Sequence, residues 1–157
     1  MRQTILYIGI LAALFFVPVE QMEVGKLIPV QVVSIYKEDA NYVIETDTEN
    51  KGLGSTAQAA LQNLKDTADG TIYLDTAQYL LITQDTRDAV EMLRKHLKPS
   101  VEMSAMETPV KVKEVAQFLE SHGRLPKLKQ WKMHKELPVL SIFEDSYIFL
   151  KKVENNA

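Results

Sequence analysis

The stretch Ser55–Asp85, STAQAALQNLKDTADGTIYLDTAQYLLITQD, decides the fold of this chain. Its first part has apolar residues at i, i+3, i+4 and i+7, which is the spacing of one helix face. These positions are Ala57, Ala60, Leu61 and Leu64. The stripe is made mostly of small residues, so we expect an amphipathic helix that lies close against a sheet. Ser55 with Gln58 three residues later predicts a capping box at its start.

The second part of the same stretch predicts the end of the helix and two strands. Asp69-Gly70 is typical of a left-handed stop, a conformation that glycine adopts at little steric cost. A short strand is expected directly after it, in the sequence TIYLD. Tyr79–Thr83, YLLIT, is apolar without alternation. Such a run is typical of a strand that is covered on both faces.

The residues before this stretch predict a β-hairpin. Residues 26–36, KLIPVQVVSIY, are rich in β-branched residues and predict one strand, with Pro29 near its start. Residues 42–46, YVIET, predict the returning strand after a polar loop of about five residues. Residues 47–54 are expected to form a loop that leads into the helix.

The residues after the central stretch add two helices and three strands. Asp85 or Thr86 is expected to cap a second helix, and alternation over residues 101–105 predicts a strand with one wet face. A third helix is expected at about residues 111–122, and a terminal hairpin around residues 144–146. The second helix would bury Ala89, Val90, Leu93 and Leu97. We therefore predict an α+β fold in which a mixed, mostly antiparallel sheet packs with about three helices.

The first 19 residues predict a signal sequence or a membrane anchor. Residues 3–19, QTILYIGILAALFFVPV, carry no charged side chain and follow Arg2. Val17-Pro18-Val19 is a poor cleavage site, which favours an uncleaved anchor over a cleaved secretory signal; a buried core helix is the third alternative. With Arg2 on the cytoplasmic side, residues 20–157 would form a single domain outside the cytoplasm.

Composition limits the classes of function. The net charge of −3 gives no global case for nucleic-acid binding, which requires a strongly basic face. Cysteine is absent, so disulfides, thiolate nucleophiles and cysteine-based metal sites are excluded. Gly52–Ser55 hints at a phosphate cradle but lacks the further glycine, and Lys51 stands where a calcium loop starting at Asp47 needs an oxygen ligand. We expect no catalytic residues, no metal and no cofactor.

A basic stretch near the C-terminus is the strongest candidate for a contact surface. Residues 124–135 hold five cations, together with Trp131 and His134. One interpretation is a solvated surface connection. The other is a contact with anionic lipid headgroups or with the acidic face of a partner, in which Trp131 would lie at the interface. The candidate contact residues are Lys127, Lys129, Trp131 and Lys132.

The order of these elements resembles a known family. The predicted hairpin in EQMEVGKLIPVQVVSIYKEDANYVIETD, at residues 20–47, is followed by a helix with Ala60-Leu61 and Asn63-Leu64. Tyr73 then lies in a short segment, and the apolar strand of residues 79–82 ends in isoleucine. This pattern, over roughly residues 20–110, resembles the N-terminal domain of the C subunit of spore germinant receptors, the Ger(x)C family.

The resemblance implies an exported, non-enzymatic subunit at the cell membrane that works beside integral membrane proteins in spore germination. Members of that family carry a lipid on a cysteine, which this chain lacks. We therefore expect a membrane-anchored accessory domain that binds a membrane protein partner. The alternative, if the leader is cleaved, is a free secreted domain that binds a small ligand or a protein.

Overall fold

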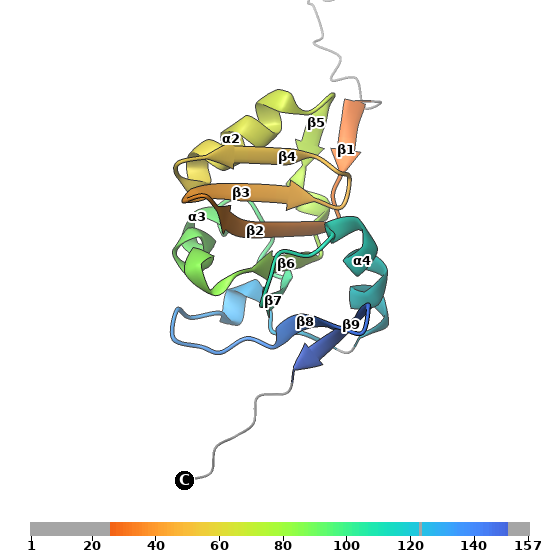
Figure 1. Cartoon of the computed structure of the whole chain (residues 1–157). Coiled ribbons are helices and arrows are strands. Elements are labelled where there is room, and N and C mark those ends of the chain that lie inside the picture. The colour runs from red at the N-terminus through yellow and green to blue at the C-terminus, as the bar shows by residue number, and fades with distance from the viewer. Residues whose placement is uncertain (1–25, 123, 151–157) are drawn as a thin grey trace, which may run out of the picture.

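The computed structural model describes residues 26–122 and 124–150, so the predicted leader, residues 1–19, lies outside it. In the described part, no helix is both long and apolar enough to cross a membrane. A seven-stranded mixed sheet runs in the order β4-β3-β2-β6-β7-β8-β9, and β1 and β5 form a separate parallel pair (Figure 1). The strands are β1 (Leu27–Pro29), β2 (Val32–Glu38), β3 (Asn41–Thr46), β4 (Lys51–Gly54), β5 (Thr71–Tyr73), β6 (Tyr79–Ile82), β7 (Glu102–Met106), β8 (Val139–Phe143) and β9 (Ser146–Leu150).

The fold is α+β, as predicted. The α-helices of the described part are α2 (Ala57–Thr67), α3 (Val90–Leu93) and α4 (Val112–Ser121). The antiparallel ladders β2/β3, β3/β4 and β8/β9 together pair more residues than the parallel ladders β2/β6, β6/β7 and β7/β8. The parallel ladders nevertheless form the centre of the sheet, with antiparallel strands at both of its edges.

Helix α2 lies against strand β4, and its apolar stripe is buried as predicted. A Cβ atom added at Gly52 would overlap the carbonyl oxygen of Ala60, so the helix backbone lies directly on the strand backbone. The predicted capping box is wrong by one residue. Thr56 is the N-cap, because its Oγ1 accepts a hydrogen bond from the Ala59 amide at 3.1 Å, and Ser55 precedes it.

The end of helix α2 also differs from the prediction. The helix ends at Ala68 in extended backbone, and none of the described glycines has a positive φ. Gly70 is needed for a different reason: a Cβ atom there would overlap the carbonyl oxygen of Lys26. Close approach of two backbones, not a left-handed turn, therefore requires this glycine.

The strand predicted at residues 26–36 is interrupted between β1 and β2. The Asp47 carboxylate accepts hydrogen bonds from the amides of Gln31 (2.9 Å) and Val32 (3.1 Å). Thr76 Oγ1 accepts another from the amide of Val30 at 2.9 Å. These side chains satisfy backbone donors at the interruption, so β1 can leave the large sheet and pair with β5.

The other connections of the hairpin are tighter than predicted. Strands β2 and β3 are joined by only Asp39 and Ala40, with φ of 49° and 66°, the signs that a type I′ turn requires. Residues 47–54 were predicted to form a loop, but they contain strand β4. This strand has only four residues, two of them glycine, so its sequence shows no clear strand pattern. The terminal hairpin forms as predicted, around Glu144 and Asp145.

Two hydrophobic cores lie on opposite faces of the sheet. One contains residues of α2, α3 and the C-terminal segment, and the other lies under α4. Strand β6 is buried on both faces, as predicted, because Leu80 and Ile82 join the first core and Leu81 joins the second. The wet face predicted for β7 is wrong: Ser104 is fully buried, and its hydroxyl donates to the Pro138 carbonyl at 2.8 Å.

The second predicted helix begins as the 3₁₀ helix η3 (Gln84–Ala89) and continues as α3. Its predicted buried residues are all buried. Thr86 does not act as its cap, because this side chain is buried and its hydroxyl donates to the Ile35 carbonyl at 3.1 Å. The other candidate cap, Asp85, lies inside η3, and Thr83 takes the N-cap position. Thr86 therefore fastens η3 to the middle of β2.

Candidate functional site

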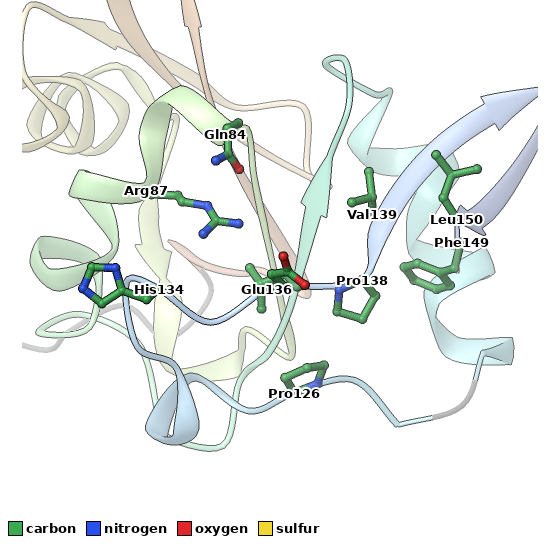
Figure 2. A pocket seen from close by; sticks show the side chains of 10 residues that line it. Gln84, Arg87, Pro126, His134, Glu136, Pro138, Val139, Phe149 and Leu150 are labelled. Atoms are coloured by element: carbon green, nitrogen blue, oxygen red, sulfur yellow. The ribbon is translucent and has the colours of Figure 1, made fainter. Parts of the chain in front are cut away.

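A cleft of about 800 Å³ lies beside η3 at the carboxyl end of β6 (Figure 2). One wall comes from η3, a second from the predicted basic stretch and the residues that lead from it into β8, and a third from β9. We call residues 124–135 the basic segment. The cleft is lined by Gln84, Arg87, Pro126, His134, Glu136, Leu137, Pro138, Val139, Phe149 and Leu150.

Two arginines hold the basic segment in place: Arg87 in η3, and Arg94 directly after α3. Arg87 Nη1 donates to the carbonyl of Met133 at 3.1 Å and to that of Lys135 at 3.5 Å. Arg94 Nη2 donates to the carbonyl of Leu128 at 3.3 Å and to that of Trp131 at 3.1 Å. Guanidinium groups suit this role because several donors lie in one rigid plane. The basic segment is therefore fixed by its backbone.

Three apolar side chains of this region are buried in the core, whereas Met133 is exposed. Leu128 and Leu137 belong to the first core, and so does Trp131, of which only 3% is exposed. The Arg94 guanidinium lies 5.9 Å from the centre of the Trp131 ring. The predicted interface role of Trp131 is therefore wrong, because a tryptophan buried under its own segment cannot reach a partner. It anchors the segment instead.

The predicted lysines differ in their surroundings. Lys129 and Lys132 are exposed, and within residues 26–122 and 124–150 neither takes part in an ion pair. Lys127 is half-buried, and its backbone forms an isolated antiparallel bridge with Glu102. Lys129 and Lys132 are thus exposed to solvent on the clamped segment that forms one wall of the cleft.

A second hollow, of about 520 Å³, adjoins the cleft and shares Gln84 and Val139 with it. It lies at the carboxyl ends of β2, β6 and β7, and Lys37 is among its lining residues. The Lys37 ammonium lies 4.6 Å from the centre of the Tyr42 ring. The hydroxyl of Tyr42 donates a hydrogen bond to Asp88, which is the main cause that raises the pKa of Tyr42.

The cleft has the properties of a recognition site. Pro138, Val139 and Leu150 give it apolar surface, while Arg87 and Glu136 bring charges of both signs. Figure 2 shows Gln84 and Arg87 on one side and Val139, Leu150 and Phe149 on the other. Its volume falls in the usual range of ligand pockets, about 300–1,000 Å³, which combine an apolar lining with a few oriented polar groups.

The cleft as a whole could not be predicted from the sequence, since its walls come from three separate segments. One signal was present: Gln84 and Arg87 follow a buried strand, and ligand sites form at the carboxyl ends of parallel strands. The predicted phosphate-cradle residues are used differently, since Gly52 and Gly54 contact α2. Among the residues that the structure describes, no group of three or more histidine and acidic side chains is placed to hold a metal ion.

A comparison of the chain with models of protein families, with curated proteins and with solved structures found no match in any of the three.

Proposed function

We propose that the chain is a non-enzymatic accessory domain, held at the cell membrane by its N-terminal segment, that docks on the acidic face of a membrane protein. The docking surface is the basic segment, through Lys129 and Lys132. One observation carries this proposal: two exposed cations, which form no ion pair with any described residue, stand on a segment whose backbone is clamped by Arg87 and Arg94. It agrees with what the resemblance to the germinant receptor C subunit implies.

Clamping matters because exposed ion pairs are weak. A single pair between flexible surface side chains stabilises by only about 0.2–1 kcal/mol, partly because ordering both side chains costs entropy. Here the backbone that carries the lysines is already ordered. A membrane tether would also raise the local concentration of a partner in the same membrane. Two or three such pairs could then hold the domain in one orientation.

A protein face fits this surface better than a lipid surface. The exposed lysines lie on the wall of a cleft that offers apolar surface and charges of both signs. Anionic headgroups would use only the lysines. A partner protein with acidic residues around one apolar side chain would use the lysines and the cleft together, which is the usual arrangement of a polar rim around an apolar contact.

Site-specific photocrosslinking in native membranes tests the proposal. A photoreactive benzoylphenylalanine at Gln130, exposed between the two lysines, should give an adduct with a membrane protein, whereas the same residue at Gln58 on α2 should not. Lys129→Glu with Lys132→Glu should abolish the adduct. Lys65→Glu with Lys95→Glu is the matched control, because it changes the net charge equally at exposed positions elsewhere and should leave the adduct intact.

Two results would contradict the proposal. The first is an adduct from Gln130 that survives Lys129→Glu with Lys132→Glu while the domain remains folded. The second is an equal loss of the adduct in the control pair of substitutions, which would indicate a general effect of net charge. High salt should weaken a true contact, because exposed charges are screened over about 8–10 Å at physiological ionic strength.

The size of the cleft favours a second candidate, a secreted domain that binds a small ligand after the leader is cleaved. The intact mass of the mature chain separates the two candidates, since cleavage would remove about the first 19 residues. Native mass spectrometry of the chain purified from its own cells would then show a bound small molecule. Val139→Trp, which fills the cleft, should remove that extra mass.

A further inference from the structure

We propose that two copies of this chain associate through strand β9, so that their sheets join into one antiparallel sheet across a twofold axis. This inference does not depend on the proposed function, although Phe149 and Leu150 of β9 also line the cleft. Strand β9 is the last strand of the sheet, and within residues 26–122 and 124–150 no strand other than β8 pairs with it. An unpaired edge is a template for another strand.

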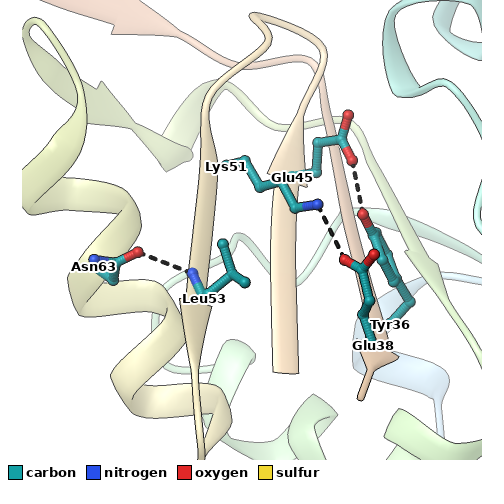
Figure 3. A network of polar contacts seen from close by, with 6 residues as sticks. All are labelled: Tyr36, Glu38, Glu45, Lys51, Leu53 and Asn63. Carbon is teal, nitrogen blue, oxygen red and sulfur yellow. Dashed lines mark hydrogen bonds and ion pairs between the residues drawn. The ribbon is translucent and has the colours of Figure 1, made fainter. Parts of the chain in front are cut away.

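The opposite edge of the same sheet shows how an edge is protected. Helix α2 lies along β4, and Asn63 Oδ1 accepts a hydrogen bond from the Leu53 amide at 2.9 Å (Figure 3). Lys51 adds a charge on this edge and pairs with Glu38 at 3.2 Å. Strand β9, with the sequence SYIFL, has no charge and no proline, and among the described residues no side chain forms a hydrogen bond with its backbone as Asn63 does at β4. The devices that prevent pairing at an edge are present at β4 and missing at β9.

The hairpin places free backbone groups on the outer side of β9. Glu144 and Asp145 form a two-residue turn, in which the flanking pair exchanges hydrogen bonds and later pairs alternate. The Leu140 carbonyl follows this pattern, because it turns toward β7 and accepts from the Glu107 amide at 3.1 Å. The backbone groups of Tyr147 and Phe149, on the other strand, therefore point away from β8.

These free groups select one register between two copies. If Ile148 lies on the twofold axis, Tyr147 of each copy lies opposite Phe149 of the other. Both residues then exchange backbone hydrogen bonds with the second copy, so all the outward groups of the strand centre are satisfied. The two aromatic pairs would lie on the α4 face, where Phe149 already packs against Phe118 at 5.5 Å between ring centres.

Charge complementarity favours a second copy as the occupant. In the sequence, Glu144 and Asp145 come directly before β9, and Lys151 and Lys152 come directly after it. An antiparallel pair brings the start of one strand beside the end of the other. The acidic end of each copy then meets the basic end of the other, and the strand is complementary to itself. A parallel pair would place like charges together.

Apolar side chains next to the edge support the same conclusion. Phe143 is 60% exposed, and Ile142 and Leu150 are among the other large exposed apolar side chains of the described residues. All three belong to the β8–β9 hairpin. Neighbouring residues of a strand point to opposite faces, so Ile142 is exposed on one face of the hairpin, and Phe143 and Leu150 are exposed on the other. Exposed apolar surface of this kind is typical of an interaction site. Association through β9 would cover part of it.

The absence of cysteine from the chain allows a direct test. Ile148→Cys in the purified full chain should form a disulfide with the same residue of a second copy, because Cα atoms in a non-hydrogen-bonded antiparallel pair lie about 4.5 Å apart. Leu53→Cys, on the covered β4 edge and also exposed, is the matched control. We expect at least about tenfold more linked dimer from Ile148→Cys, since contact raises the effective concentration to roughly the millimolar range.

A mixture of two variants tests the register. Ser146→Cys and Leu150→Cys should link to each other and not to themselves, because these positions lie opposite one another in the proposed pair. Reversing the charge with Lys151→Glu and Lys152→Glu should reduce the Ile148→Cys dimer severalfold, and adding Glu144→Lys and Asp145→Lys should restore it. A circular dichroism melt of each variant would verify that it is folded.

Two outcomes would overturn the proposal. The first is a linked dimer from Ile148→Cys that is no more abundant than the one from Leu53→Cys. The second is linkage of Ser146→Cys with itself, which indicates another register.

Discussion

The two edges of the seven-stranded sheet are built differently. At β4, a helix lies on the strand so closely that two positions must be glycine, and an asparagine side chain binds the outer backbone. At β9, the strand is longer, uncharged and paired only with β8 among the described residues. One edge is closed by the chain itself, and the other is left available. The difference separates the part that holds the fold together from the part that is suited to binding.

The cleft lies near the open edge, and this placement is consistent with the same division. Phe149 and Leu150 of β9 line the cleft, whereas no residue of α2 or β4 does. Elements with few buried contacts open locally at low free-energy cost, and binding surfaces are drawn from such elements. Matched substitutions at the two edges therefore test whether the closed edge contributes more to stability than the open edge does.

The largest expected effect comes from a charge placed under the closed edge. Leu61→Asp introduces an unpaired carboxylate at a fully buried position of α2 and should cost more than about 4 kcal/mol, enough to unfold a domain of this size. Ile148→Asp, at a half-buried position of β9, should cost about 1 kcal/mol. Urea unfolding followed by circular dichroism measures both. Equal costs would show that the two edges contribute equally to stability.

The next effect comes from the contact between the α2 and β4 backbones. Gly52→Val would force side-chain atoms into the space of Ala60 and Leu64 in α2, so we expect a loss of about 3 kcal/mol in the free energy of unfolding. Ser146→Val, at an exposed position of β9, should change it by less than about 0.5 kcal/mol. A stable Gly52→Val variant would mean that α2 can move away from the sheet.

A smaller effect is expected at the asparagine that covers the β4 edge. Asn63→Ala removes the acceptor of the Leu53 amide and should cost about 1 kcal/mol. Gln62→Ala is the matched control, since Gln62 bonds only within the exposed face of α2, to Asp66 at 2.8 Å. Hydrogen exchange measured by NMR should show faster exchange at the Leu53 amide in the first variant alone. Unchanged exchange would show that the helix, not the side chain, protects this edge.

How much of this fold could be predicted from sequence depended on the range of the interactions. The stripe of α2, the doubly buried β6 and the terminal hairpin depend on local periodicity, and all three were predicted correctly. The cap at Thr56 depends on one backbone angle, which a pattern cannot separate from Ser55. The interruption between β1 and β2 depends on Asp47 and Thr76, which come from elsewhere in the chain.

The site was harder to predict than the fold. The exposed lysines of the basic segment were found from charge density alone. Trp131 was misplaced because its burial depends on Arg94 and the core beneath it, and neither is near in sequence. The cleft could not be predicted, because its walls come from η3, the basic segment and β9, which are far apart in the sequence. The order of the parallel strands brings these segments together, and local patterns do not reveal that order.

The smallest expected effect compares two tyrosines that pack into the same core, one on β2 toward the closed edge and one on β9 at the open edge. Tyr36 in β2 and Tyr147 in β9 both have a raised pKa, chiefly because of burial and next because of a nearby carboxylate, Glu45 for the first and Glu114 for the second. Tyr36 is the more buried, with 7% exposed, and its hydroxyl donates to Glu45 at 3.1 Å within the polar network of the closed edge (Figure 3).

A raised pKa of tyrosine makes the folded state less stable at alkaline pH. Below the unfolded pKa of about 10, both states hold the phenol proton and stability is unaffected. As the pH rises above about 10, the unfolded chain releases this proton first, so the free energy of unfolding falls until the folded pKa is passed. Tyr36→Phe should flatten this fall between about pH 9 and 11 more than Tyr147→Phe does, because Tyr36 is more deeply buried. Urea unfolding of both variants and the parent at several pH values measures the slopes. A larger change in slope from Tyr147→Phe would mean that the more buried phenol lies at the open edge. That result would contradict the conclusion that the closed edge is the more tightly packed of the two.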